Sequence, residues 1–248
     1  MRSIAGQCDW SSRSAAAERL DQSRWPAIER VAPRVERWRY SETLGYVRTI
    51  TANKGVLTVA SAGNSNVDLQ HKFTDASSPN DGSYPVETRT INGACVDLPA
   101  EAPGVVTVSA VGPGQLKSYY SSYGQGVVDV TAPGGDSRQP NPAVSTPANT
   151  ILSTVINTTT KVNGYGYKQG TSMASPHAAG VAALALSAHP DLSPGALASM
   201  LERTAVALPC PEGVYDPRPG LPFQAECTGG ARNSFYGAGN VNAFNVVR

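Results

Sequence analysis

The sequence predicts an α/β fold with a mainly parallel sheet. Short β-branched runs that end at glycine, asparagine or proline alternate with segments of helical periodicity, which is typical of a parallel sheet covered by helices. The 248 residues are 40% hydrophobic, and this is enough apolar chain for one sizeable core. With 24 glycines and 19 prolines, the chain has many turns but not the composition of a disordered or collagenous protein.

The first two predicted elements are a helix over residues 41–55 and a strand over 55–61. Ser41 is a suitable N-cap, apolar residues recur on one face, and Gly55 stands just past the end of the helix. The strand, GVLTVAS, is a compact β-branched run that stops at Ala-Gly-Asn, as expected of a buried parallel strand.

Three further strands are predicted after a long polar excursion over residues 65–103. They are GVVTVSAV (104–111), VVDVTAPG (127–134) and ILSTVI (151–156), and turn-rich loops separate them.

Two helices complete the predicted fold. The first begins near Ser172 and is apolar on nearly every side, so we expect it to be central in the domain. Ser193 and Pro194 form the N-cap and N1 signature of the second, which extends to about Ala205.

The first forty residues differ from the rest of the chain. They hold all three tryptophans and a cluster of arginines but no lysine, and Pro33 interrupts their one stretch of helical spacing. We therefore divide the chain into an Arg/Trp-rich extension over 1–40, disordered or not native to the domain, and a domain over 41–248. A basic arm is the alternative interpretation of the extension.

Charge and hydropathy exclude several classes of function. A formal net charge of +1 lacks the basic excess of a nucleic-acid binder. No apolar run is long enough to span a bilayer, and residues 1–20 have no apolar core of a signal peptide. Asp- and Asn-rich loops at 64–68 and 75–82 leave calcium binding open, although their spacing is not that of an EF-hand. No other metal or cofactor is predicted.

The four cysteines show no metal-ligand spacing. Cys210 and Cys227 bracket a Pro- and Gly-rich stretch, which is compatible with a loop closed by a disulfide in an oxidising compartment. Free thiols are the alternative. The connectivity of Cys8 and Cys95 is left open.

The eight residues from Gly170 to His177, GTSMASPH, carry the chemistry that the sequence predicts. Small residues allow a tight turn that places the Ser172 hydroxyl in the first turn of a buried helix. There the helix dipole and the unpaired N–H groups favour negative charge, which suits an oxyanion that forms beside a nucleophile. Pro176 is tolerated close to the start of a helix.

GTSMASPH followed by AAGVAALAL closely resembles the nucleophile segment of the subtilisin-like serine proteases, the subtilases. Ser61-Ala62-Gly63-Asn64 resembles the oxyanion segment of that family. The segments VVTVSAVG, SYYSSYGQGVVDVTAPGG and FYGAGNVNAFNVV resemble further family segments in the family's order, so the resemblance covers roughly residues 45–248. It implies a three-layer subtilisin-like fold with a mainly parallel sheet.

The resemblance also implies roles for individual residues. Ser172 would be the nucleophile, and Asn64 would donate to the oxyanion together with the Ser172 backbone N–H. A plain turn asparagine is the alternative for Asn64. For the primary specificity pocket, the resemblance implies Ser61, Ala62 and Gly63 as one wall. It implies Ser109 and Ala110 near the floor.

Two motifs of the family are missing from this sequence. Subtilases carry an aspartate in a D-[ST]-G strand end and a histidine in an HGTH-like helix start, both before the Ala-Gly-Asn segment, and neither motif occurs here. The three histidines do not replace them: we expect His177 to be structural and His71 and His189 to lie on the surface. The fold is therefore expected to be incomplete at its N-terminus, as in a truncated or mis-started reading of a longer subtilase.

Two functions follow from these observations. The first is a serine endopeptidase that hydrolyses peptide bonds through a Ser172 acyl-enzyme, secreted as the family is, with protein or peptide substrates and neither nucleic acid nor membrane as partner. The alternative is a fragment or pseudo-protease without activity, at most a peptide-binding module. The oligomeric state is left open.

Overall fold

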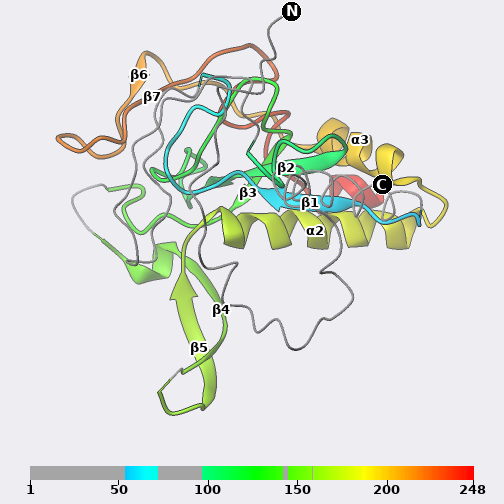
Figure 1. Ribbon diagram of the computed structural model, residues 1–248, viewed down its shortest axis with the longest axis horizontal. Coiled ribbons are helices and arrows are strands. Elements are labelled where there is room, and N and C mark those ends of the chain that lie inside the picture. The colour runs from blue at the N-terminus through cyan, green and yellow to red at the C-terminus, as the bar shows by residue number, and fades with distance from the viewer. Residues whose placement is uncertain (1–53, 72–96, 142–144, 158) are drawn as a thin grey trace, which may run out of the picture.

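The computed structural model describes residues 54–71, 97–141, 145–157 and 159–248 of the chain (Figure 1). At its centre is a three-stranded parallel sheet in the order β1-β2-β3. Its strands are β1 (Thr58–Ser61), β2 (Val105–Val111) and β3 (Val130–Pro133). Each strand lies within a predicted run, and the α/β prediction with a parallel sheet is confirmed.

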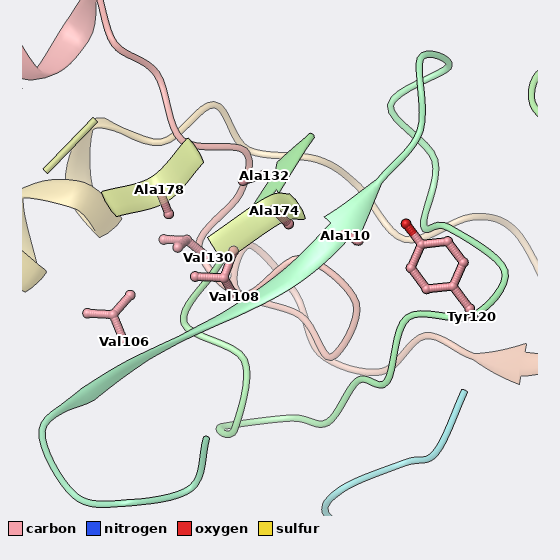
Figure 2. Close-up of a cluster of buried hydrophobic side chains, with 8 residues drawn as sticks. All are labelled: Val106, Val108, Ala110, Tyr120, Val130, Ala132, Ala174 and Ala178. Carbon is pink, nitrogen blue, oxygen red and sulfur yellow. The ribbon is translucent and has the colours of Figure 1, made fainter. Parts of the chain in front are cut away.

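All seven residues of the middle strand β2 are buried, and they alternate between two packing partners. Val106, Val108 and Ala110 belong to the cluster in which Ala174 and Ala178 of helix α2 meet the sheet (Figure 2). The residues between them face loop segments. The Thr107 hydroxyl donates to Ala100 O at 2.6 Å, and the Ser109 hydroxyl donates to Phe235 O at 2.7 Å. Small side chains on both elements let helix and sheet approach closely.

Helix α2 (Thr171–Ala188) begins close to its predicted start near Ser172, and α3 (Pro194–Thr204) begins directly after its predicted N-cap, Ser193. Ser193 Oγ accepts the N–H of Ala196 at 3.3 Å, as an N-cap serine does. α2 lies along the sheet (Figure 1), and its C-terminal half packs against α3 and the 3-10 helix η5 (Asn245–Val247).

Helix α2 packs against the sheet on one side and against α3 and η5 on another, but part of its surface is exposed. Leu184 and Leu186 on the remaining surface are 48% and 37% exposed. Because the helix is apolar all round, its sequence contains no polar face that would tell which side is uncovered.

The predicted strand over 151–156 forms, but not in the parallel sheet. β4 (Ile151–Ile156) pairs in antiparallel register with β5 (Asn163–Lys168), after a short 3-10 helix, η4 (Pro147–Asn149). This hairpin extends away from the sheet (Figure 1), and β5 leads directly into α2. A second small hairpin pairs β6 (Val214–Tyr215) with β7 (Ala225–Glu226).

Several predictions fall outside the described residues. These are the extension over 1–40, residues 41–53 of the first predicted helix, Cys8, Cys95 and the loop 75–82. Within the described ranges, no helix is both long and apolar enough to cross a membrane.

Candidate active site

The start of α2 presents Ser172 at the surface. Gly170 precedes the helix with φ 153°, a conformation that favours glycine, and its N–H donates to Gly134 O at 3.0 Å in the loop after β3. Thr171 is buried, whereas Ser172 is exposed. The N–H groups of Met173 and Ala174 return to Gly170 O at 2.9 and 3.3 Å. The Ser172 N–H has no such partner among the described residues, so it remains available to an incoming group.

Asn64 lies just past the end of β1, at the carboxyl edge of the parallel sheet, and contacts the same turn. Its Oδ1 accepts the Thr171 N–H at 2.9 Å and the Thr171 hydroxyl at 3.0 Å. Both contacts use the amide oxygen, so the orientation of the amide is fixed and the Nδ2 hydrogens are left for another acceptor. The structure therefore brings the two predicted catalytic residues, Asn64 and Ser172, to neighbouring positions.

Thr171 was not singled out by the sequence analysis. Its position directly before Ser172 in GTSMASPH was the available signal, but its contact with Asn64 joins residues 107 positions apart. Only the folded chain shows that Thr171 orients the amide.

The turn after Asn64 is held by a buried lysine. Asn66, with φ 51°, donates its N–H to Tyr120 O at 2.8 Å, and its Oδ1 accepts from Lys117 Nζ at 2.5 Å. The Lys117 ammonium also lies 5.0 and 5.4 Å from the ring centres of Tyr123 and Phe235. Burial lowers the pKa of Lys117 to about 7, and the nearby negative charge of Asp136 opposes this shift only in part.

The residues expected to form the specificity pocket divide into two groups. Ser61 and Gly63 are partly exposed at the end of β1, where they remain able to contact a substrate. Ala62, Ser109 and Ala110 have 0–1% of their surface exposed. Ala110 packs in the cluster beneath α2, and a place for these three residues at the wall or floor of the pocket stays a prediction.

None of the three histidines contacts Ser172. His177 Nδ1 lies 2.8 Å from Met173 O on its own helix, as expected of a structural residue. His71 Nδ1 pairs with Asp68 Oδ2 at 3.0 Å, and its side chain is 70% exposed. His189 is the C-cap of α2. Among the described residues, the Ser172 hydroxyl has no hydrogen-bond partner.

A disulfide joins Cys210 and Cys227, with their Cα atoms 5.5 Å apart. The loop that it closes carries β6 and β7 and packs beside the lysine. The Tyr215 hydroxyl donates to Lys117 O at 2.7 Å, and Gln224 O accepts from Asn66 Nδ2 at 3.2 Å. The disulfide-closed loop thus contacts the turn that follows Asn64.

The part of the chain that the structure describes contains no cluster of three or more His, Cys, Asp or Glu side chains able to hold a metal ion. The Asp68 carboxylate, at the end of the loop 64–68, is hydrogen-bonded to the backbone that follows it. Its Oδ1 accepts the N–H groups of Gln70 and His71 at 2.9 and 3.3 Å.

Known proteins resemble this chain in sequence. An extracellular protease of Xanthomonas campestris pv. campestris is 38% identical over 149 residues, which are 59% of this chain and 20% of that protein. Fervidolysin of Fervidobacterium pennivorans is 32% identical over 181 residues, which are 68% of this chain and 21% of fervidolysin. The chain thus spans about a fifth of the length of these relatives.

Solved structures show the same fold. A protease from Pseudoalteromonas arctica superposes with a TM-score of 0.54 at 30% identity, over 82% of this chain and 45% of that one. A lanthipeptide protease superposes with a TM-score of 0.57 over 84% of this chain and 54% of its own, at 24% identity. Residues 12–239 match the sequence model of the Subtilase family. This chain belongs to the subtilase family.

Proposed function

We propose that this site hydrolyses peptide bonds in the manner of a subtilisin-type serine endopeptidase, with Ser172 as the nucleophile. Ser172 Oγ attacks the carbonyl carbon of the substrate and loses its proton to a base. The tetrahedral intermediate collapses to a Ser172 ester as the amine leaves with a proton, and water then hydrolyses the ester. The chemistry needs no cofactor, and its substrates are proteins or peptides.

The observation that carries this proposal is the contact between Thr171 and Asn64. Because Thr171 occupies Oδ1 with two donors, Nδ2 is oriented as a donor beside the first turn of α2. The Ser172 backbone N–H, which lies in that first turn, is the second free donor. Two preorganised donors next to a serine hydroxyl form the arrangement that stabilises an oxyanion.

A second candidate function is peptide binding without cleavage. It is favoured by the histidines, because the ring of His177 is held by Met173 O and that of His71 by Asp68. A serine hydroxyl without a base is a weak nucleophile. In this case Ser61, Gly63 and the start of α2 would hold a peptide that remains intact.

An external base separates the two candidates. The chain is treated with a fluorophosphonate probe in phosphate and in imidazole buffer at one pH, and the adduct is located by mass spectrometry. We expect labelling near background in phosphate and a clear rise at Ser172 in imidazole, because imidazole can act as the base that the proposed attack requires. Ser172→Ala should not label, and Ser175→Ala, on the next turn of the same helix, should label as the unchanged chain does.

Asn64→Leu tests the oxyanion donor in the same assay. Removal of one such donor costs subtilisin about 10²–10³ in rate, so the imidazole-dependent labelling should fall by a similar factor. Strong Ser172 labelling in phosphate would reject the second candidate. A folded chain that shows no labelling in imidazole would contradict the proposed hydrolysis and favour peptide binding.

A further inference from the structure

We infer that Arg218, on the disulfide-closed loop, forms a subsite that binds a carboxylate of the peptide substrate near Ser172. The inference rests on the function proposed above and adds to it a preference for acidic substrates. Three observations support it. The guanidinium lies over two aromatic rings, it has no carboxylate partner among the described residues, and its loop is closed by a disulfide.

The guanidinium lies over a platform of two aromatic rings, and one of them is hydrogen-bonded to Gln169, just before the segment that carries Ser172. Its central carbon is 4.8 Å from the ring centre of Tyr119 and 5.2 Å from that of Phe223. The Tyr119 hydroxyl accepts from Gln169 Nε2 at 3.0 Å. Gln169 stands three residues before Ser172, so their Cα atoms are at most about 11 Å apart, given 3.8 Å between consecutive Cα atoms.

This guanidinium has no carboxylate partner among the described residues. Arg232 shows the contrast, because it pairs with Asp129 at 2.9 Å and with Glu202 at 2.6 Å. The nearby Asp216 is already engaged: its Oδ1 accepts the Arg218 backbone N–H at 3.3 Å, and its Oδ2 accepts from Gln224 Nε2 at 3.0 Å.

Ring contacts leave the hydrogen-bonding edge of a guanidinium available. An arginine that lies over aromatic faces keeps its planar fork of N–H donors, and this fork matches the two oxygens of a carboxylate. Arg218 is only partly buried, so a ligand can reach that edge. Its platform therefore favours an anionic, planar ligand group over a neutral one.

The loop is attached firmly enough to act as a binding surface. The Cys210–Cys227 disulfide closes it, and Ala225 is buried in one cluster with Phe235. Gln169, which donates to the Tyr119 hydroxyl, is held as well, because its Oε1 accepts the Ser137 N–H at 2.8 Å. The guanidinium thus has a defined position relative to the start of α2.

An acidic side chain or the C-terminal carboxylate of the substrate would supply the ligand. An extended peptide rises about 3.4 Å per residue, so the position of the carboxylate along the peptide sets how far from Ser172 it can reach.

The test measures peptide binding to the Ser172→Ala chain, which removes cleavage from the readout. Fluorescent ten-residue peptides of otherwise neutral sequence carry one glutamate, moved through every position, and each is compared with its glutamine counterpart by anisotropy. All have amidated C-termini, and a second set has free C-termini and no glutamate. We expect glutamate to bind about five- to tenfold more tightly than glutamine at one or two adjacent positions, as a charge-assisted pair provides. A gain confined to the free C-terminus identifies the terminal carboxylate as the ligand.

Substitutions in the same background assign the effect to Arg218. Arg218→Gln should abolish the preference, and Arg218→Glu should reverse it in favour of lysine-containing peptides. Arg248→Gln is the matched control. Its guanidinium also lies over a ring, 4.0 Å from the centre of Phe244, but it follows η5, which packs against the C-terminal half of α2.

Peptides that bind with no carboxylate preference at any position would overturn the inference and leave the proposed function intact. A preference that survives Arg218→Gln would overturn it too. Failure of every peptide to bind would contradict the proposed function together with the inference.

Discussion

Lys117 and Asn66 are joined by a hydrogen bond of 2.5 Å between Nζ and Oδ1, beneath the turn that carries Asn64. The lysine has no exposed surface, and its ammonium contacts two aromatic rings and an amide in place of water. An amide and two rings replace the lost hydration only in part, which is why burial lowers the pKa of Lys117 to about 7.

This pair predicts a pH-dependent stability. Lys117 has a pKa of about 7 in the folded chain and 10.5 in the unfolded chain, so the unfolded state binds more protons between these values. Stability should therefore rise as the pH increases from 7 to 9.5. Between pH 7 and 9.5 we expect a gain on the order of 3 kcal/mol in the free energy of unfolding, measured by urea denaturation.

Lys117→Met removes the titrating group and should flatten this rise. Lys168→Met, which changes an exposed lysine on β5, is the matched control and should keep it. Parallel pH curves for the unchanged chain and Lys117→Met would contradict the prediction.

Thr171→Val tests how the Asn64 amide is oriented. The substitution conserves shape and removes the hydroxyl donor to Oδ1 but keeps the backbone N–H donor. Loss of one hydrogen bond of about 1 kcal/mol should lower imidazole-dependent labelling of Ser172 roughly fivefold. Thr171→Ser keeps the hydroxyl and should restore most of the rate. Equal rates for Thr171→Val and the unchanged chain would show that the hydroxyl does not orient Asn64.

Gly134→Ala tests the close packing of the loop after β3 against Ala110 and Gly170. A Cβ at Gly134 would lie 2.5 Å from the Ala110 Cβ and 2.8 Å from Gly170 O. Overpacking of this kind costs about 1–3 kcal/mol, and Gly134 also accepts the N–H of Gly170, so Ser172 labelling should fall as well.

Gly180→Ala is the counterpart on the exposed surface of α2, where a Cβ meets nothing within 4 Å. It should stabilise the chain by about 0.5–1 kcal/mol. Thermal unfolding measures both, and a neutral Gly134→Ala would contradict the packing described here.

Removal of the disulfide should lower stability and loosen the Arg218 platform. The bridged cysteines are 17 residues apart, for which loop-closure entropy gives about 3 kcal/mol. The double variants Cys210→Ser/Cys227→Ser and Cys210→Ala/Cys227→Ala should lose similar amounts in urea denaturation, because the loss comes from the unfolded chain. A loss seen only with serine would point to the burial of a hydroxyl and would contradict this account.

Local patterns in the sequence predicted the strands, the helix starts and the nucleophile. β-branched runs between glycines and prolines predicted β1, β2 and β3, because β-branched side chains pack well on the pleated surface of a sheet. Ser193 predicted the start of α3 through its own side chain. Ser172 was predicted from eight consecutive residues, since a nucleophile at a helix start is built by its immediate neighbours.

Contacts between distant segments were not predictable in this way. Asn64 and Thr171 are 107 residues apart, Lys117 and Asn66 are 51 apart, and Asn66 and Gln224 are 158 apart. No local pattern indicates that these side chains meet.

The sequence by itself determined which residues are able to do chemistry: a serine at the start of a helix, an asparagine at the end of a strand, and two cysteines around a loop. The tertiary structure decided their environment. It buried Ser109 and Ala110, which had been expected in the pocket, placed a lysine among aromatic rings, left Leu184 and Leu186 of α2 partly exposed, and placed Arg218 over the rings of Tyr119 and Phe223. The physical reason is that backbone conformation depends mainly on neighbouring residues, whereas burial and hydrogen-bond partners depend on segments that only the folded chain brings together.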